Sequence, residues 1–335
     1  MRCIGENWLE LFDTECRADD GWRPSRTARS AGGSIITYRT QTIRAGEQIE
    51  VRAYPIWNTA PEIPGDPKNR KSPEAMARAN ETNARLKFAR KANTNFTAAD
   101  TLLTTTYTEG YLPDAEQAKR DMRNYLNRIN HACKKAGLPN ARYMGVTEGK
   151  REGSKQTRLH HHCLISCGLS REELEGLWKM GRVRAERLQP DRYGLTALAN
   201  YLMKNPQGAK RYFCSRNLKE PVITKADTKL SIRRAERMAA DVEEAAPEIF
   251  RKLYPDCEFL DCNVKRGKFV EGVYICAKLR KVATEKPKKG GRGDAACGGA
   301  KKQERSGGRS RTGTSDGTQP KPKSSKEAGS ATSRH

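Results

Sequence analysis

The sequence predicts an α+β fold, in which a small antiparallel sheet carries helices on one face. The first observation behind this prediction is the order of the elements expected between residues 101 and 178, which runs strand, helix, strand, strand, helix. The second is a stripe of apolar residues at helical spacing after the first strand, formed by Met122, Tyr125, Leu126, Ile129 and Cys133. Such a stripe needs one sheet face to pack on, so these elements are expected to share one core.

Turn and capping residues mark the ends of these elements. Asp114 is the expected N-cap of the first helix, and Ser170 with Glu173 forms a capping box before the second. A polar turn separates the last two strands and makes them antiparallel neighbours. The expected strands are short runs rich in Thr and apolar residues, at 101–107, 142–148 and 158–166. A further helix is indicated by Leu195, Leu198, Ala199 and Leu202.

The flanking segments are less regular, and they divide the chain into expected parts. We expect a hairpin at 33–57, a loop at 58–73, helices at 74–91 and 229–245, and strands at 257–264 and 271–280. The corresponding parts are an N-terminal β-hairpin with a basic helical extension packed on the core (1–95), the core itself (96–225), a C-terminal α/β extension (226–282) and a disordered basic tail (283–335).

The chain is strongly basic. Its 335 residues include 64 Lys and Arg against 40 Asp and Glu, which gives a net charge of +24. The tail at 283–335 contains no Leu, Ile, Val, Phe, Tyr or Trp, so it cannot bury enough apolar surface to fold. About +16 remains on the other residues, and nucleic acid is the polyanion expected to bind that charge.

Several classes of protein are excluded by the same residues. No run approaches the ~20 apolar residues of a membrane-spanning helix, so no membrane partner is expected. The ten cysteines form no Cys-x-x-Cys motif, and reduced thiols in the cytoplasm are the simplest interpretation. No Gly-x-x-x-x-Gly-Lys-Ser/Thr sequence is present, which argues against a P-loop motor in this chain.

Three consecutive histidines stand out, because the chain has only five. On a strand, His160 and His162 point to the same face and His161 to the other. Two imidazoles side by side are a natural pair of metal ligands, and Glu148 at the end of the preceding strand can add a carboxylate. This donor set suits Mg²⁺ or Mn²⁺ shared with a phosphate, or a transition metal. The alternative is a set of ordinary sheet histidines, or a nucleic-acid contact.

A tyrosine and a lysine lie three residues apart on the helix expected near residue 200. Lys204 beside Tyr201 favours the phenolate form and can hold a phosphate oxygen, so Tyr201 is a candidate nucleophile. The alternative is a tyrosine that packs at a helix edge with its hydroxyl in water. Bases alternate with aromatic residues further on, and the residues expected to contact DNA are Arg158, Lys210, Arg211, Tyr212, Arg216 and Lys219.

These segments together resemble the HUH endonucleases, the rolling-circle replication initiators of plasmids and phages. The details are most similar to bacterial replication-associated proteins related to the filamentous-phage gene II protein. The resemblance covers roughly residues 45–225 and is carried by TLLTTTYTEGYLPD, YMGVTEGK, RLHHHCLIS, LWKMGRV, LQPDRYGLTALANYLMK and KRYFCSRNLKEP. It implies a ferredoxin-like, palm-type core with Mg²⁺ or Mn²⁺ as cofactor.

The resemblance also implies a role for each site residue. His160 and His162 match the two metal-binding histidines, while His161 occupies a position that is usually hydrophobic. Glu148 matches the acidic third ligand, with Glu152 as the alternative. Tyr201 matches the nucleophile and Lys204 its companion. Tyr193 is a second candidate that lacks a Lys three residues later, so the chain is similar to the single-tyrosine group.

The implied activity is site-specific nicking and rejoining of single-stranded origin DNA. A 5′-phosphotyrosine intermediate would leave a free 3′-hydroxyl primer, and helicase and polymerase would come from the host cell. Three alternatives stay open: a relaxase or single-tyrosine transposase with the same chemistry, a non-catalytic nucleic-acid-binding protein, and a metal-dependent hydrolase that uses water. The origin sequence, the native metal and the oligomeric state are not readable from these residues.

Overall fold

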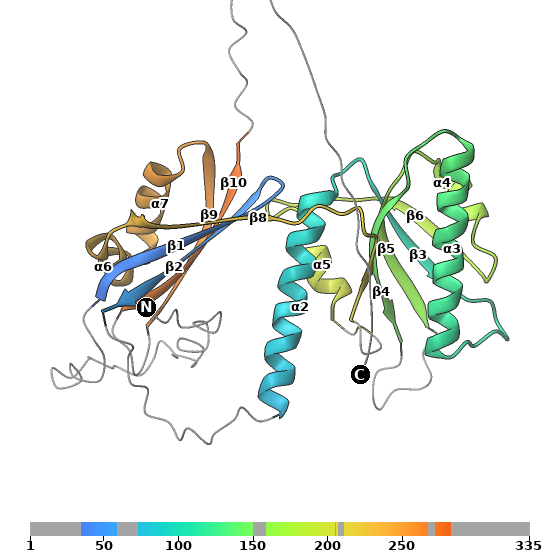
Figure 1. The fold of residues 1–335 in the computed structure, drawn as a ribbon, viewed down its shortest axis with the longest axis horizontal. Helices are drawn as coiled ribbons and strands as arrows, with labels where there is room; N and C mark the ends of the chain where they lie inside the picture. The colour runs from blue at the N-terminus through green and yellow to red at the C-terminus, as the bar shows by residue number, and fades with distance from the viewer. Residues whose placement is uncertain are drawn as a thin grey trace, which may run out of the picture. The chain divides into compact units, whose positions relative to one another are not determined.

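A computed structural model describes residues 35–58, 73–149, 159–204, 206, 211–266 and 272–282. Within these residues the chain forms two five-stranded antiparallel sheets and six helices (Figure 1), which confirms the α+β class. No helix among them is long and apolar enough to cross a membrane. The tail expected at 283–335 and the N-terminal 33 residues lie outside the described part.

One sheet contains the histidine strand. Its strand order is β6-β3-β5-β4-β7, and all neighbouring pairs are antiparallel. The histidines begin β5, which lies in the centre of this sheet between β3 and β4. The bounds are β3 (Thr101–Thr106), β4 (Arg142–Glu148), β5 (His160–Ser166), β6 (Val183–Arg187) and β7 (Phe213–Cys214).

Helices α3 (Ala115–Lys135) and α4 (Arg171–Gly176) begin where the sequence predicts. The Asp114 carboxylate accepts a hydrogen bond from the backbone N–H of Gln117, and Ser170 forms the expected capping box with Glu173. The apolar stripe of α3 is buried against Leu103, Cys163 and Ile165 of β3 and β5, on the sheet face opposite His160 and His162. The predicted helix–sheet layer is therefore present.

The second face of this sheet is also covered, in part, by α2 (Pro73–Asn95) and α5 (Thr196–Leu202). Met144, Val146 and Leu164 make this face apolar, and Phe88 of α2 packs there with Leu202 of α5. Helix α2 is the basic helix expected from the sequence. Its packing brings α5, the helix that carries Tyr201, onto the face that also bears His160 and His162.

The other sheet has the order β8-β1-β2-β10-β9 and joins the two ends of the described chain. Helices α6 (Ile232–Ala240) and α7 (Val242–Leu253) pack on its buried face. The sequence predicts one helix at 229–245, but Asp241 ends α6 and caps α7. The strand bounds are β1 (Ile35–Ala45), β2 (Gln48–Trp57), β8 (Val222–Leu230), β9 (Cys257–Arg266) and β10 (Val273–Lys281).

Candidate metal centre and tyrosine helix

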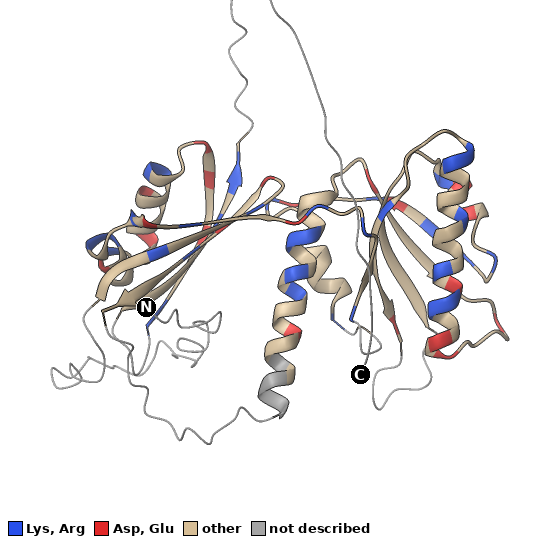
Figure 2. Cartoon of the chain, in the orientation of Figure 1, with Lys and Arg blue, Asp and Glu red and all other residues tan. Residues whose placement is uncertain are grey.

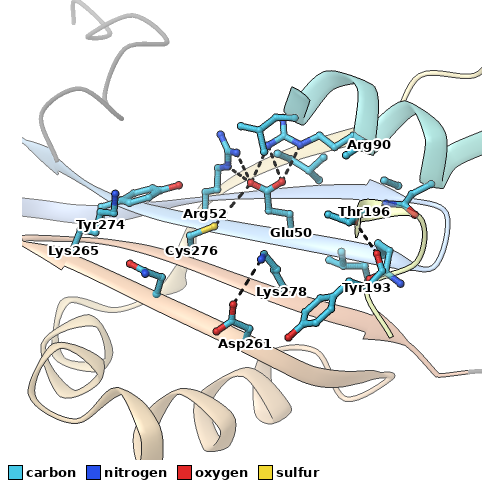
Figure 3. Close-up of a pocket in the computed structure, with 18 residues that line it drawn as sticks. Glu50, Arg52, Arg90, Tyr193, Thr196, Asp261, Lys265, Tyr274, Cys276 and Lys278 are labelled. Carbon is cyan, nitrogen blue, oxygen red and sulfur yellow. Dashed lines mark hydrogen bonds and ion pairs between the residues drawn. The ribbon is translucent and has the colours of Figure 1, made fainter. Parts of the chain in front are cut away.

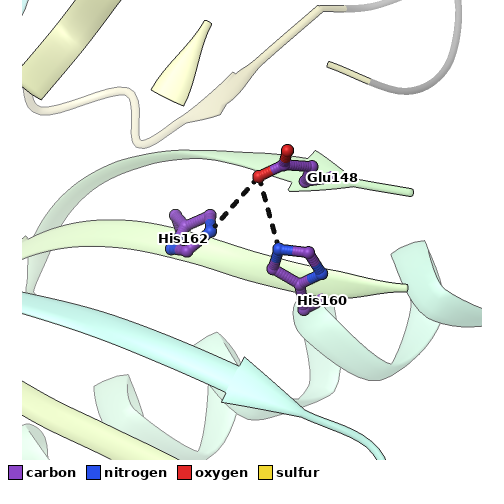
Figure 4. A group of neighbouring side chains, drawn as sticks. All are labelled: Glu148, His160 and His162. Atoms are coloured by element: carbon purple, nitrogen blue, oxygen red, sulfur yellow. Dashed lines mark ion pairs between the residues drawn. The ribbon is translucent and has the colours of Figure 1, made fainter. Parts of the chain in front are cut away.

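Three donor side chains converge at the paired ends of β4 and β5. In the β4–β5 register Glu148 lies directly opposite His160, so their side chains share a face with His162. Glu148 Oε2 lies 3.3 Å from His160 Nε2 and 3.5 Å from His162 Nε2 (Figure 4). The structure thus brings together the three residues predicted as ligands. Glu152, the alternative ligand, lies outside the described residues.

A threonine on the neighbouring strand orients His162. Thr104 pairs with His162 in the β3–β5 register, and its Oγ1 lies 3.1 Å from His162 Nδ1. When Nδ1–H donates to this hydroxyl, the Nε2 lone pair points toward Glu148 and can bind a metal. Burial and the neighbouring His160 lower the pKa of His162, while Glu148 raises it. The lowered pKa favours the neutral ring that a metal requires.

His161 points the other way and is held between two hydroxyl groups. Its Nε2 lies 3.0 Å from Tyr107 Oη, and its Nδ1 lies 2.9 Å from Thr147 Oγ1. Burial lowers the pKa of His161 to about 4, so the ring is neutral at pH 7. A buried polar ring with both nitrogens hydrogen-bonded is a structural element, which explains how a histidine occupies a position where the resemblance implies a hydrophobic residue.

The donor set fits a divalent metal ion. One ligand atom from each of Glu148, His160 and His162 lies within 4.8 Å of the others, and no second such group occurs among the described residues. Two neutral imidazoles and one carboxylate suit Mn²⁺ or a transition metal, and the carboxylate also suits Mg²⁺. The side chains are only partly exposed, at 24% for His160 and Glu148 and 11% for His162.

Tyr201 lies on the exposed side of α5. Its side chain is 65% exposed, whereas Ala199, Leu202 and Met203 are buried in the core between α2, α5 and the sheet. Lys204 is also exposed, and it follows the end of α5 rather than lying within the helix. Pro206 then forms an antiparallel bridge with Glu148. The segment that follows Tyr201 therefore returns to the strand end that bears the carboxylate of the candidate metal centre.

The predicted DNA contacts lie in different surroundings. Arg158 and Lys210 fall outside the described residues, and Arg216 and Lys219 are exposed. Arg211 Nη1 lies 4.0 Å from Glu81 Oε2. The Tyr212 ring is half-buried and packs edge-on against Phe88, with the ring centroids 5.3 Å apart. Part of the Tyr212 ring therefore packs against the hydrophobic core.

With this geometry in view, we compared the chain with known proteins. Residues 100–206 match the family described as replication-associated protein ORF2/gene II protein. The matched segment begins just before β3, ends at Pro206 and contains Glu148, both candidate histidine ligands and Tyr201. Over these residues the chain is similar to replication-associated proteins. No curated protein and no solved structure matches the chain.

A further feature lies largely outside the segment that resembles replication-associated proteins. A cavity of about 350 Å³ is lined by residues of β1, β2, β9, β10 and α2 and of the start of α5 with the turn before it (Figure 3). Glu50 sits between Arg52 and Arg90, and Lys278 Nζ lies 3.7 Å from Asp261 Oδ2. Sequence patterns do not reveal this ion-pair group, because its members are separated by up to 228 positions and share no local pattern.

Charged residues are spread over both sheets and their helices (Figure 2). Helix α3 shows this most clearly, with exposed Lys119, Arg120, Arg123, Lys134 and Lys135 on its outer side. These bases contribute part of the positive charge of the chain. That charge is the reason why the sequence predicts a nucleic-acid partner.

Proposed function

We propose that this protein initiates rolling-circle replication by nicking and rejoining single-stranded origin DNA through Tyr201. The observation that carries the proposal is the convergence of Glu148, His160 and His162 on the sheet face against which the tyrosine helix packs. The bridge between Pro206 and Glu148 supports it, because this bridge ties the end of the Tyr201 segment to the same site.

Glu148, His160 and His162 would hold the divalent metal, Mg²⁺ or Mn²⁺. A bound ion supplies Lewis-acid stabilisation of the charge that develops on the oxygens of the scissile phosphate. By accepting a hydrogen bond from Nδ1–H, Thr104 would keep the His162 ring in the tautomer that presents Nε2 to the site. The partial burial of these groups strengthens their electrostatic effect on a phosphate, because the local dielectric constant is lower than that of water.

Tyr201 would supply the nucleophile. Its Oη attacks phosphorus, a bond forms between Tyr201 and the 5′-phosphate, and the bond from phosphorus to the 3′-oxygen breaks. The phenol proton is lost and the departing 3′-oxygen gains a proton, which yields a 3′-hydroxyl. Exposed Lys204 would stabilise the phenolate or hold a phosphate oxygen. A later 3′-hydroxyl can reverse the reaction and reseal the strand, since the phosphodiester is stored in the covalent link.

Residues around the site would bind the DNA strand, and host proteins would act on the nicked product. Arg158, Lys210, Arg211, Arg216 and Lys219 would contact the DNA strand around the nick, with the exposed part of Tyr212 available for stacking. The 3′-hydroxyl would prime synthesis by a host polymerase, with a host helicase unwinding the duplex in the cytoplasm of a bacterial cell.

A covalent-adduct experiment tests the proposal. Labelled single-stranded oligonucleotides that tile both strands of the replicon carrying this gene are incubated with the protein and Mn²⁺ or Mg²⁺, then run on a denaturing gel. We expect a labelled protein band that requires metal and disappears in Tyr201→Phe and in His160→Ala/His162→Ala. Tyr193→Phe is the matched control, because it removes a tyrosine hydroxyl eight positions earlier in the same segment.

Each other outcome contradicts the proposal in a distinct way. Cutting without an attached label indicates a metal-dependent hydrolase that uses water. Binding without cutting, unchanged in Tyr201→Phe across all oligonucleotides, indicates a non-catalytic nucleic-acid-binding protein. An adduct that forms only on hairpin ends or transfer-origin strands of the element indicates a transposase or relaxase with the same chemistry.

A further inference from the structure

Helix α5 has no cap of its own. Its N-cap residue, Leu195, makes no side-chain hydrogen bond, and its first turn contains no acidic residue. The helix is seven residues long, and a helix of that length is not stable in isolation. Its N-terminal N–H groups therefore need partners from elsewhere in the fold.

Asn93, in the last turn of α2, supplies one of these partners. Its Oδ1 accepts a hydrogen bond of 2.7 Å from the backbone N–H of Leu195, and its Nδ2 donates one of 3.0 Å to Thr196 Oγ1. The Thr196 hydroxyl in turn donates to the Tyr193 carbonyl at 2.8 Å. A single amide side chain thus caps the N-terminus of α5, although Asn93 lies about one hundred positions earlier in the sequence.

The space around Asn93 is tightly filled. Gly194 has φ +66°, and a Cβ there would lie 2.4 Å from Asn93 Oδ1. Gly46, in the β1–β2 turn, has φ +63°, and a Cβ there would lie 2.2 Å from the Asn93 carbonyl oxygen. Two glycines in the left-handed region therefore let the hairpin and the α5 turn approach Asn93 from two sides.

The other end of α5 is also fixed. Arg85 Nε donates to the Met203 carbonyl oxygen at 3.3 Å, and Pro206 pairs with Glu148. The C-terminal end of α5 is thus held next to the candidate metal centre, and the hydrogen bonds of Asn93 hold its N-terminal end. Tyr201 lies six residues after Leu195, roughly 9 Å along the helix axis.

We propose that Asn93 is a positioning residue for Tyr201. By capping α5 from another helix, Asn93 prevents the short helix from fraying and holds the Tyr201 side chain in the direction needed for attack on a phosphate. This inference rests on the proposed function. A misplacement of a nucleophile by about 1 Å can cost about 100-fold in rate. Loss of the cap should therefore lower the rate of the chemical step.

The test compares Asn93→Ala with Asn95→Ala. Asn95 lies two residues later in α2 and makes an analogous pair of bonds, since Nδ2 donates to the Lys219 carbonyl oxygen at 2.8 Å and Oδ1 accepts from the Lys219 N–H at 2.7 Å. Asn93→Ala loses two hydrogen bonds of the amide, and Asn95→Ala loses three, because Asn95 Nδ2 also donates to the Lys91 carbonyl oxygen at 2.9 Å. Only Asn93 touches α5. The readouts are the single-turnover rate of adduct formation at saturating oligonucleotide, the Kd for that oligonucleotide, the Kd for Mn²⁺ and the thermal midpoint.

We expect Asn93→Ala to lower the single-turnover rate by about 10- to 100-fold, with both Kd values unchanged. Asn95→Ala should lose at least as much stability, because Asn95 is buried and makes one hydrogen bond more, and it should keep the wild-type rate at saturating oligonucleotide. Asn93→Asp retains the acceptor for Leu195 N–H and should recover part of the rate. Should Asn93→Ala not fold, Thr196→Val, which removes only the hydroxyl that Asn93 holds, carries the same comparison.

A wild-type rate in Asn93→Ala, or in Thr196→Val where that variant is needed, would overturn the inference. An equal loss of rate in Asn95→Ala would also overturn it, since the effect would then be one of stability alone. These outcomes differ from failure of the proposed function, in which Tyr201→Phe itself still forms the adduct or wild-type protein forms none.

Discussion

The Thr104 hydroxyl lies 3.1 Å from Nδ1 of His162, on the strand next to the one that bears the histidines. This contact orients the ring of one candidate ligand, although Thr104 is not itself one of the three candidate ligands. Residues that orient metal ligands in this way affect affinity by about 10- to 100-fold.

Replacing Thr104 should therefore weaken metal binding. We expect Thr104→Val, a substitution of similar shape, to raise the Mn²⁺ Kd by at least about 10-fold, and Thr104→Ser to restore it. Thr106→Val is the matched control, because Thr106 Oγ1 donates to the Arg182 carbonyl oxygen at 3.3 Å. Calorimetric titration measures the affinities. Equal Mn²⁺ affinity in Thr104→Val and wild type would show that this hydroxyl does not orient the ligand.

The identity of the carboxylate ligand is tested by two amide substitutions. Glu148→Gln keeps the shape of the side chain and removes its charge, so it should weaken Mn²⁺ binding by about 100-fold or more, beyond the range for residues that only orient ligands. Glu152→Gln should leave binding unchanged. The reverse pattern would assign the third ligand to Glu152.

His161 should matter for stability and not for metal binding. His161→Leu removes a hydrogen-bond partner of buried Tyr107 Oη, which keeps a 3.5 Å contact with the Ala118 carbonyl oxygen, and of half-buried Thr147 Oγ1. Loss of these two hydrogen bonds should lower the free energy of unfolding by about 1–3 kcal/mol, which urea denaturation in the presence of a chelator would measure. Loss of Mn²⁺ binding with unchanged stability would instead place His161 among the ligands and reverse the faces of β5.

The edge of the second sheet carries a pH-dependent ion pair. Arg39 of β1 makes two hydrogen bonds of 2.7 Å to the Asp227 carboxylate on β8, and these bonds lower the pKa of Asp227. Stability from this pair is therefore present above the ordinary Asp pKa and is lost as the pH falls through the lowered folded-state value. Because Asp227 is 42% exposed, we expect at most about 1 kcal/mol.

Comparison with Asp227→Asn isolates that contribution. The difference in unfolding free energy between wild type and Asp227→Asn should be largest near pH 7 and should vanish at acidic pH. A difference that stays constant from neutral to acidic pH would mean that the carboxylate is not paired in the folded state.

The candidate site was predictable where its chemistry is local in sequence. His160 and His162 share a face because strand side chains alternate, and Glu148 ends the strand that precedes theirs in the sequence and pairs with it. The caps at Asp114 and Ser170 were predictable for the same reason, since each depends on residues three positions away.

Features that depend on distant segments were not predictable. Strand β8 escaped prediction because most of its residues are exposed, so it lacks an apolar alternation. Thr104 and Asn93 look like ordinary strand and helix residues until the fold places them beside His162 and Leu195. Likewise, nothing local shows that β9 and β10 complete a sheet with the β1–β2 hairpin.

The most direct test of the central claim is to identify the residue that carries the DNA. The covalent adduct is digested with nuclease and trypsin, and the nucleotide-bearing peptide is sequenced by mass spectrometry. Cleavage after Arg192 and Lys204 yields one peptide that contains both Tyr193 and Tyr201, so fragmentation must separate them. We expect a nucleotide 5′-phosphate on Tyr201. A nucleotide on Tyr193, or on any other residue, would contradict it.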